Sequence, residues 1–188
     1  VADRQRYRQA QEDSKAAGRT FGLLREATFV FRTPESARDL AVVLANAFPD
    51  PKRVAIGLTE LLLNAVEHGN LGISYEEKGR LREEERWSEE VAARLADPAY
   101  AGREVTVVYR RDDDEIRVRI QDQGDGFEFQ RYLEMDPARA FDSHGRGIAM
   151  ARMLSFDTID YLGRGNEVEV SIALSPPMDE TAAEAAAR

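Results

Sequence analysis

The stretch Glu60-Leu-Leu-Leu-Asn64-Ala-Val-Glu-His68-Gly69 decides the fold that we expect for this chain. It ends a helix predicted over about 52–68, and most other side chains of that helix are apolar. Helical spacing places the polar side chains on one stripe: Glu60, Asn64, Glu67 and His68. A buried carboxylate needs a cation, a metal or a hydrogen-bond donor beside it. The stripe therefore faces either a bound ligand or solvent, and the helix alone does not decide between them.

Two of these side chains suit phosphate chemistry. Asn64 offers a neutral oxygen, a ligand type that suits a Mg²⁺ ion bridging phosphate oxygens. Glu60, one turn earlier, is placed to take a proton from a water or a hydroxyl group.

A second motif, Asp122-Gln-Gly124-Asp-Gly126, follows a predicted strand. Asp122 has the same parity as Ile120 and the apolar residues before it, so its side chain should emerge on the buried face where the strand ends. A carboxylate there can accept a hydrogen bond from an exocyclic amine such as that of adenine, while Gly124 and Gly126 let the backbone approach the base. The alternative is an ordinary turn made of Gly and Asp.

A third motif, His144-Gly145-Arg146-Gly147-Ile148, opens a helix predicted over 147–154. Helix N-termini preceded by glycine are natural phosphate sites. Arg146 either adds positive charge there or points outward. We interpret the two histidines, His68 and His144, as hydrogen-bonding or structural residues.

The order of predicted elements indicates an α+β fold, a two-layer α/β sandwich with a mixed, mainly antiparallel sheet and helices on one face. Strands are predicted over 27–32, 105–109, 116–120, 157–162 and 167–174, and helices over 37–48, 52–68 and 147–154. The highly charged segment 73–103 fits two short helices in a solvated insertion without a ligand role. The tail over 176–188 is expected to fray.

Composition excludes several classes of function. The 188 residues carry 26 basic and 35 acidic side chains, a formal net charge of −9, so direct binding to nucleic acid is not expected. Cysteine is absent, and neither a membrane span nor a secretory leader is visible, so we expect a cytoplasmic protein that binds a small ligand or a protein partner. The chain opens at Val1, and 1–26 fits a linker or homodimerisation helix behind an upstream domain.

The three motifs, in this order and spacing, resemble the N, G1 and G2 boxes of the histidine-kinase-like ATPases, the Bergerat-fold superfamily. Within it the chain is most similar to the anti-sigma-factor serine/threonine kinases and to ATPase output domains of response regulators, over roughly 27–175. The resemblance implies ATP and Mg²⁺ as cofactors, Glu60 as general base, Asn64 as the Mg²⁺ ligand, Asp122 as the adenine reader and 127–144 as a mobile lid. The candidate nucleotide contacts are Asn64, His68, Asp122, Gly124, Gly126, Phe127, His144, Gly145, Arg146, Gly147 and Ile148.

The sequence departs from that family in two places. Where the family often has a Gly-Thr pair before the last strand, this chain has Gly165-Asn166-Glu167. The insertion at 73–103 is longer than a minimal domain of this kind needs, and a partner-docking or regulatory role is one explanation.

Three functions follow as hypotheses. The leading one is a serine/threonine protein kinase, in which Glu60 helps a partner's hydroxyl attack the γ-phosphate of ATP. The second is the catalytic half of a histidine kinase or a response-regulator output domain, although 1–26 contains no histidine to phosphorylate. The third is a nucleotide-sensing module that sequesters a partner without transfer. A sigma factor or its antagonist is one candidate partner, and an unrelated protein is another.

Overall fold

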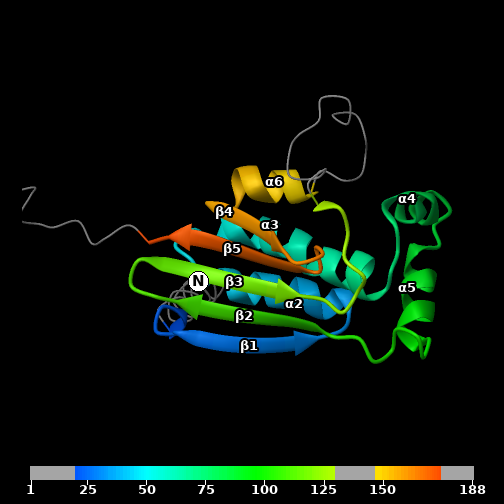
Figure 1. Cartoon of the computed structure of the whole chain (residues 1–188), viewed down its shortest axis with the longest axis horizontal. Helices are drawn as coiled ribbons and strands as arrows, with labels where there is room; N and C mark the ends of the chain where they lie inside the picture. The colour runs from blue at the N-terminus through cyan, green and yellow to red at the C-terminus, as the bar shows by residue number, and fades with distance from the viewer. Residues whose placement is uncertain (1–19, 130–146, 175–188) are drawn as a thin grey trace, which may run out of the picture.

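A single five-stranded sheet covered by helices on one face forms the body of the molecule (Figure 1). The structure, a computed structural model, describes residues 20–129 and 147–174. The strands run in the order β1-β2-β3-β5-β4, and all four pairings are antiparallel. Their bounds are β1 Glu26–Phe31, β2 Val105–Arg111, β3 Glu115–Gln121, β4 Thr158–Leu162 and β5 Glu167–Ala173. The two-layer α+β fold is confirmed, with a wholly antiparallel sheet where the sequence analysis allowed a mixed one.

Alternation in the strands assigns one face of the sheet to the core. Along β3 the buried positions are Ile116, Val118 and Ile120, and the arginines between them are exposed. The register sets Val118 opposite Tyr109 of β2, and both are fully buried. Burial on this face is the main source of stability, because apolar area removed from water contributes about 25 cal/mol per Å².

Two long helices, α2 (Pro34–Ala45) and α3 (Pro51–Asn64), pack side by side on that face (Figure 1). Each begins with a capping residue followed by proline, the expected start signal. The Thr33 side chain accepts a hydrogen bond from the backbone N–H of Ser36 at 3.2 Å, and Asp50 accepts one from Arg53 at 3.1 Å. These caps fix where α3 starts, and thereby the turn on which its polar residues fall.

Beyond Asn64 the helix widens into a π-helical segment, η1 (Ala65–Asn70). The sequence predicted an ordinary helix as far as His68. The wider turn, in which the Leu71 N–H reaches the Val66 carbonyl at 2.8 Å, rotates the side chains that follow. Glu67 thereby leaves the predicted stripe: it is 1% exposed and paired with Lys78.

The charged insertion folds into the two short helices that the sequence predicted, α4 (Tyr75–Glu83) and α5 (Trp87–Ala96). As expected of a solvated insertion, most of its residues are exposed or half-buried. Leu81 and Val91 are buried and belong to the main hydrophobic core. The insertion is therefore an integral part of the domain.

The last helix, α6 (Gly147–Leu154), lies against α3 and is followed by β4 and β5 (Figure 1). Gly57 of α3 lets the residues directly after α6 approach closely, since a Cβ atom there would lie 2.5 Å from the side chains of Ser155 and Phe156. Among the helices that the structure describes, none has the length and apolarity to cross a membrane. Most of the predicted linker helix and of the predicted lid lies outside the described residues, as does the tail.

Candidate functional site

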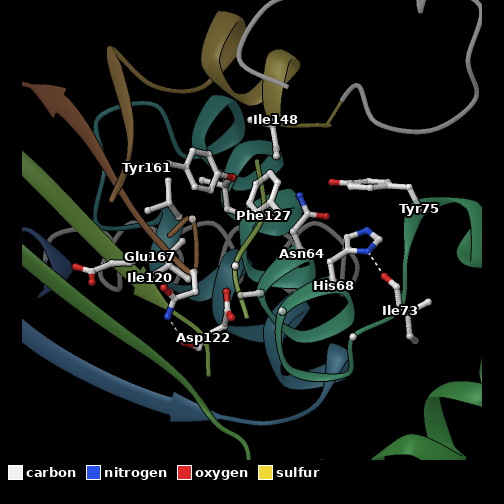
Figure 2. A pocket seen from close by; sticks show the side chains of 18 of the residues that line it. Asn64, His68, Ile73, Tyr75, Ile120, Asp122, Phe127, Ile148, Tyr161 and Glu167 are labelled. Carbon is white, nitrogen blue, oxygen red and sulfur yellow. Dashed lines mark hydrogen bonds between the residues drawn. The ribbon is translucent and has the colours of Figure 1, made fainter. Parts of the chain in front are cut away.

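A cavity of about 550 Å³ opens where the end of α3, the insertion and the open end of the sheet meet (Figure 2). Its size falls in the range of about 300–1,000 Å³ that is usual for small-molecule sites. Five segments line it: Leu61–Gly69, Gly72–Glu76, Ile120–Phe127, Ile148, and Tyr161–Val168, each contributing some of its residues. All three sequence motifs therefore reach the same cavity.

Asp122 lies at one end of the cavity, directly after β3, as its parity with Ile120 predicted. One of its carboxylate oxygens accepts the N–H of Gly124 at 2.8 Å. Burial raises the pKa of this carboxyl to about 6, while that hydrogen bond and the nearby Arg164 and Arg103 lower it. A carboxyl group whose pKa is raised by burial in a cavity is typical of a ligand-binding site.

The backbone of Asp122 is fixed by Asn166, which directly precedes β5. The Asp122 N–H donates to the Asn166 carbonyl at 3.0 Å, and the Asn166 side-chain amide donates to the Asp122 carbonyl, also at 3.0 Å. Asn166 occupies the position at which the family often has threonine. Its amide is engaged with the strand end, so it orients Asp122 in the cavity wall.

Two glycines allow the motifs to meet at Asp122. Gly69, at the end of the first motif, lies so close that a Cβ atom would sit 2.5 Å from a carboxylate oxygen of Asp122. A Cβ atom on Gly124 would in turn overlap the Gly69 carbonyl. Any side chain at either position would push the first and second motifs apart.

The opposite end of the cavity is formed by α3 and the first turn of α6. The Glu60 carboxylate lies against Gly147, where an added Cβ atom would overlap an oxygen of Glu60. Asn64, one turn further along α3, lines the cavity, whereas Glu60 and Gly147 are not among its lining residues. The Glu60 carboxylate thus lies at the start of a helix, a position where phosphate groups bind readily.

His68 also lines the cavity, as a neutral ring. Its Nδ1 atom is hydrogen-bonded to the Ile73 carbonyl, so Nδ1 carries the proton and donates. Burial lowers the pKa of His68 to about 4. Nε2 is then an acceptor, buried and without a partner among the residues described.

Aromatic and aliphatic side chains complete the wall around Asp122. Phe127 packs edge-on against Tyr161, with ring centroids 5.3 Å apart, and Ile120 and Ile148 also line the cavity. Figure 2 shows these side chains directed into the cavity from β3, from the loop that follows β3, from β4 and from α6. A flat, apolar ring system with a polar edge at Asp122 fits this environment.

Six of the predicted nucleotide contacts line the cavity: Asn64, His68, Asp122, Gly126, Phe127 and Ile148. Gly124 and Gly147 support it through the close contacts above. His144, Gly145 and Arg146 lie outside the described residues. The sequence did not predict Tyr75, Tyr161 or the orienting role of Asn166, because nothing in the local pattern separates these residues from core or surface ones.

The donor set also fits a magnesium ion held largely by its nucleotide. Within the described ranges, no group of three or more His, Cys, Asp or Glu residues could hold a metal ion. Mg²⁺ is commonly bound through one or two protein oxygens together with phosphate oxygens and water, and Asn64 provides one such oxygen.

Comparison with known proteins agrees with this geometry. Residues 24–172 match the family model described as "Histidine kinase-like ATPase domain". No curated protein matches the chain. The match spans most of the chain and every residue that lines the cavity. This protein therefore belongs to the histidine kinase-like ATPase family.

Proposed function

We propose that this ATP-binding regulatory domain is a serine/threonine protein kinase of the anti-sigma-factor type, which phosphorylates or sequesters a protein partner in bacterial signalling. The observation that carries the proposal is the placement of the Glu60 carboxylate at the first turn of α6, one helical turn before Asn64, which lines the cavity. A base placed there suits transfer of a phosphoryl group to a hydroxyl.

Asp122 is the residue that recognises the adenine ring in this proposal. Its carboxylate accepts a hydrogen bond from the exocyclic amine, and the apolar wall that includes Ile120 and Phe127 encloses the ring. With the base there, the triphosphate runs toward Asn64 and the start of α6. Asn64 would hold Mg²⁺, which when bound offsets the negative charge of the phosphates.

The transfer step assigns one role to Glu60. Its carboxylate accepts the proton of a serine or threonine hydroxyl on the partner while that oxygen bonds to the γ-phosphorus. The bond from the γ-phosphorus to the β,γ-bridging oxygen breaks, and ADP leaves with that electron pair. Positioning and charge stabilisation supply most of the rate enhancement in such transfers.

His68 is poorly suited to accept a phosphoryl group itself. Its Nδ1 is hydrogen-bonded to the Ile73 carbonyl, its Nε2 is buried, and the ring packs against Tyr75 with centroids 3.9 Å apart. This argues against autophosphorylation at the histidine of the first motif.

The test uses γ-labelled ATP, the purified protein and candidate partners, beginning with a sigma factor and its antagonist. We expect acid-stable label on a partner serine or threonine, since phosphohistidine is acid-labile. Glu60→Gln should keep ATP binding and lose the transfer, whereas Asp122→Asn should weaken binding. Unchanged transfer by Glu60→Gln would refute the role given to Glu60, and ATP binding without transfer to any partner would favour the sequestering module.

A further inference from the structure

The insertion is anchored to the first motif by buried charge. Lys78 of α4 forms an ion pair with Glu67, and their side chains are only 12% and 1% exposed. Lys78 also lies over the ring of Trp87, with Nζ 5.3 Å from the ring centroid. Separating the two charges of an ion pair that is this buried is strongly unfavourable. The pair therefore holds α4 in one position relative to η1.

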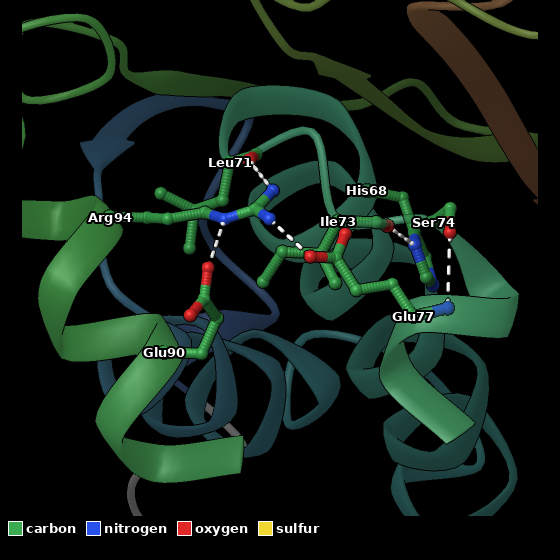
Figure 3. A network of polar contacts seen from close by, with 7 residues as sticks. All are labelled: His68, Leu71, Ile73, Ser74, Glu77, Glu90 and Arg94. Carbon is green, nitrogen blue, oxygen red and sulfur yellow. Dashed lines mark hydrogen bonds and ion pairs between the residues drawn. The ribbon is translucent and has the colours of Figure 1, made fainter. Parts of the chain in front are cut away.

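A second anchor is the Arg94 guanidinium of α5, shown in Figure 3. It donates to the Leu71 carbonyl at 2.8 Å, to Glu77 of α4 at 2.5 Å and to Glu90 of α5 at 2.8 Å. One side chain thus ties both helices of the insertion to the backbone that follows η1.

These anchors place Tyr75 at the cavity. Ser74 caps α4 by accepting the N–H of Glu77 at 3.1 Å, so Tyr75 is the first residue of the helix. Its ring packs against that of His68 in a tilted arrangement, with a centroid distance of 3.9 Å and an interplanar angle of 31°. His68 is itself fixed by its bond to the Ile73 carbonyl (Figure 3), so the two rings hold each other in place.

The Tyr75 side chain lines the cavity and, in Figure 2, extends toward Asn64 with its hydroxyl group leading. Asp122 lies at the other end. If the base occupies the Asp122 end, as the proposed function requires, the hydroxyl group meets the part of the ligand that follows the base. That part carries ribose and phosphate oxygens, which accept hydrogen bonds.

We infer that Tyr75, supplied by the insertion, is a further nucleotide-binding residue, which donates a hydrogen bond to a ribose or phosphate oxygen and positions the His68 ring. This inference rests on the proposed function of the cavity as an ATP site. It makes the charged insertion a part of the binding site, so that nucleotide affinity depends on α4 being docked.

The experiment measures dissociation constants of ATP, ADP, adenosine and adenine by displacement of a fluorescent ATP analogue. Tyr75→Phe removes only the hydroxyl group, and Tyr75→Ala removes the ring as well. Arg80→Ala is the matched control, because Arg80 is an exposed residue of the same helix and does not line the cavity. Trp87 is the single tryptophan of the chain, so its emission reports whether the insertion is still docked.

We expect Tyr75→Phe to weaken ATP about tenfold, the usual effect of losing a hydrogen bond to a charged group. Adenine should be unaffected, and Tyr75→Ala should weaken ATP further. A loss confined to ATP and ADP identifies a phosphate contact, and a loss that extends to adenosine identifies a ribose contact.

Two results would overturn the inference. The first is that Tyr75→Phe and Tyr75→Ala both bind ATP with the same affinity as Arg80→Ala. The second is that Tyr75→Phe loses affinity for adenine and for ATP to the same extent while the Trp87 emission is unchanged. Failure of the unaltered protein to bind ATP would instead remove the proposed function, and this inference with it.

Discussion

Asp122→Asn should make the nucleotide-free protein more stable and its nucleotide complex weaker. Asparagine keeps an oxygen for the Gly124 N–H, 2.8 Å away in the wild type, and removes a charge that burial disfavours. Burial raises the pKa of the Asp122 carboxyl from 3.8 to about 6. At about 1.36 kcal/mol per tenfold change in proton affinity, the ionised carboxylate costs the folded state up to about 3 kcal/mol.

The sign of the pH dependence follows from the raised pKa. The folded protein binds the Asp122 proton more tightly than the unfolded chain does. The corresponding stability is therefore fully present below pH 3.8 and is lost as the pH rises through about 6. The advantage of Asp122→Asn should be largest at pH 8 and should vanish toward pH 4.

Urea unfolding of both proteins at pH 4, 6 and 8 measures this difference directly. For a domain of this size, 3 kcal/mol corresponds to a melting shift on the order of 6–12 °C at pH 8. The same variant should show a smaller melting shift on addition of Mg²⁺-ATP. An Asp122→Asn protein that is less stable than the wild type at pH 8, or a difference that does not change with pH, would refute the reasoning.

Three further substitutions test separate parts of the structure. Gly57→Ala should lower the free energy of unfolding by about 1–3 kcal/mol in urea, because its Cβ atom has no room against Ser155 and Phe156, directly after α6. Gly102→Ala, with nothing within 4 Å of an added Cβ atom, should leave the stability unchanged. Asn166→Ala should raise the dissociation constant of ATP about three- to tenfold in a calorimetric titration, because Asp122 loses the hydrogen bond that its backbone carbonyl accepts from the Asn166 side chain. Unchanged affinity would show that this hydrogen bond does not contribute to binding. Lys78→Met should destabilise the protein by about 3–5 kcal/mol, because it leaves the Glu67 carboxylate buried without a cation. The same substitution should cost much less in a protein that also carries Glu67→Gln. Equal losses in both backgrounds would show that the ion pair is not the anchor.

Local sequence signals were sufficient for most of the fold. Capping residues and alternation predicted the body of α3 and the strands β2 and β3, because caps and period-two burial act over a few residues. The same reasoning predicted the position of Asp122, because strand parity continues one residue past β3.

What the sequence did not predict depends on contacts between distant segments. The π-helical turn η1 brings Gly69 against Asp122, and no local pattern encodes that contact. The sequence predicted Glu67 as part of a ligand-facing stripe, whereas in the structure it pairs with Lys78 of another helix. Tyr75 has the surroundings of a surface helix in sequence, yet it lines the cavity, in an insertion that the buried Lys78–Glu67 ion pair anchors.

Calorimetric titration of the wild-type protein with Mg²⁺-ATP and, separately, with Mg²⁺-GTP tests the central claim most directly. Guanine presents a carbonyl oxygen where adenine presents its amino group, so the Asp122 carboxylate should favour ATP. We expect one saturable site with a clear preference for ATP, and loss of that preference in Asp122→Asn. No binding of ATP, or equal affinity for the two nucleotides in the wild type, would contradict the account.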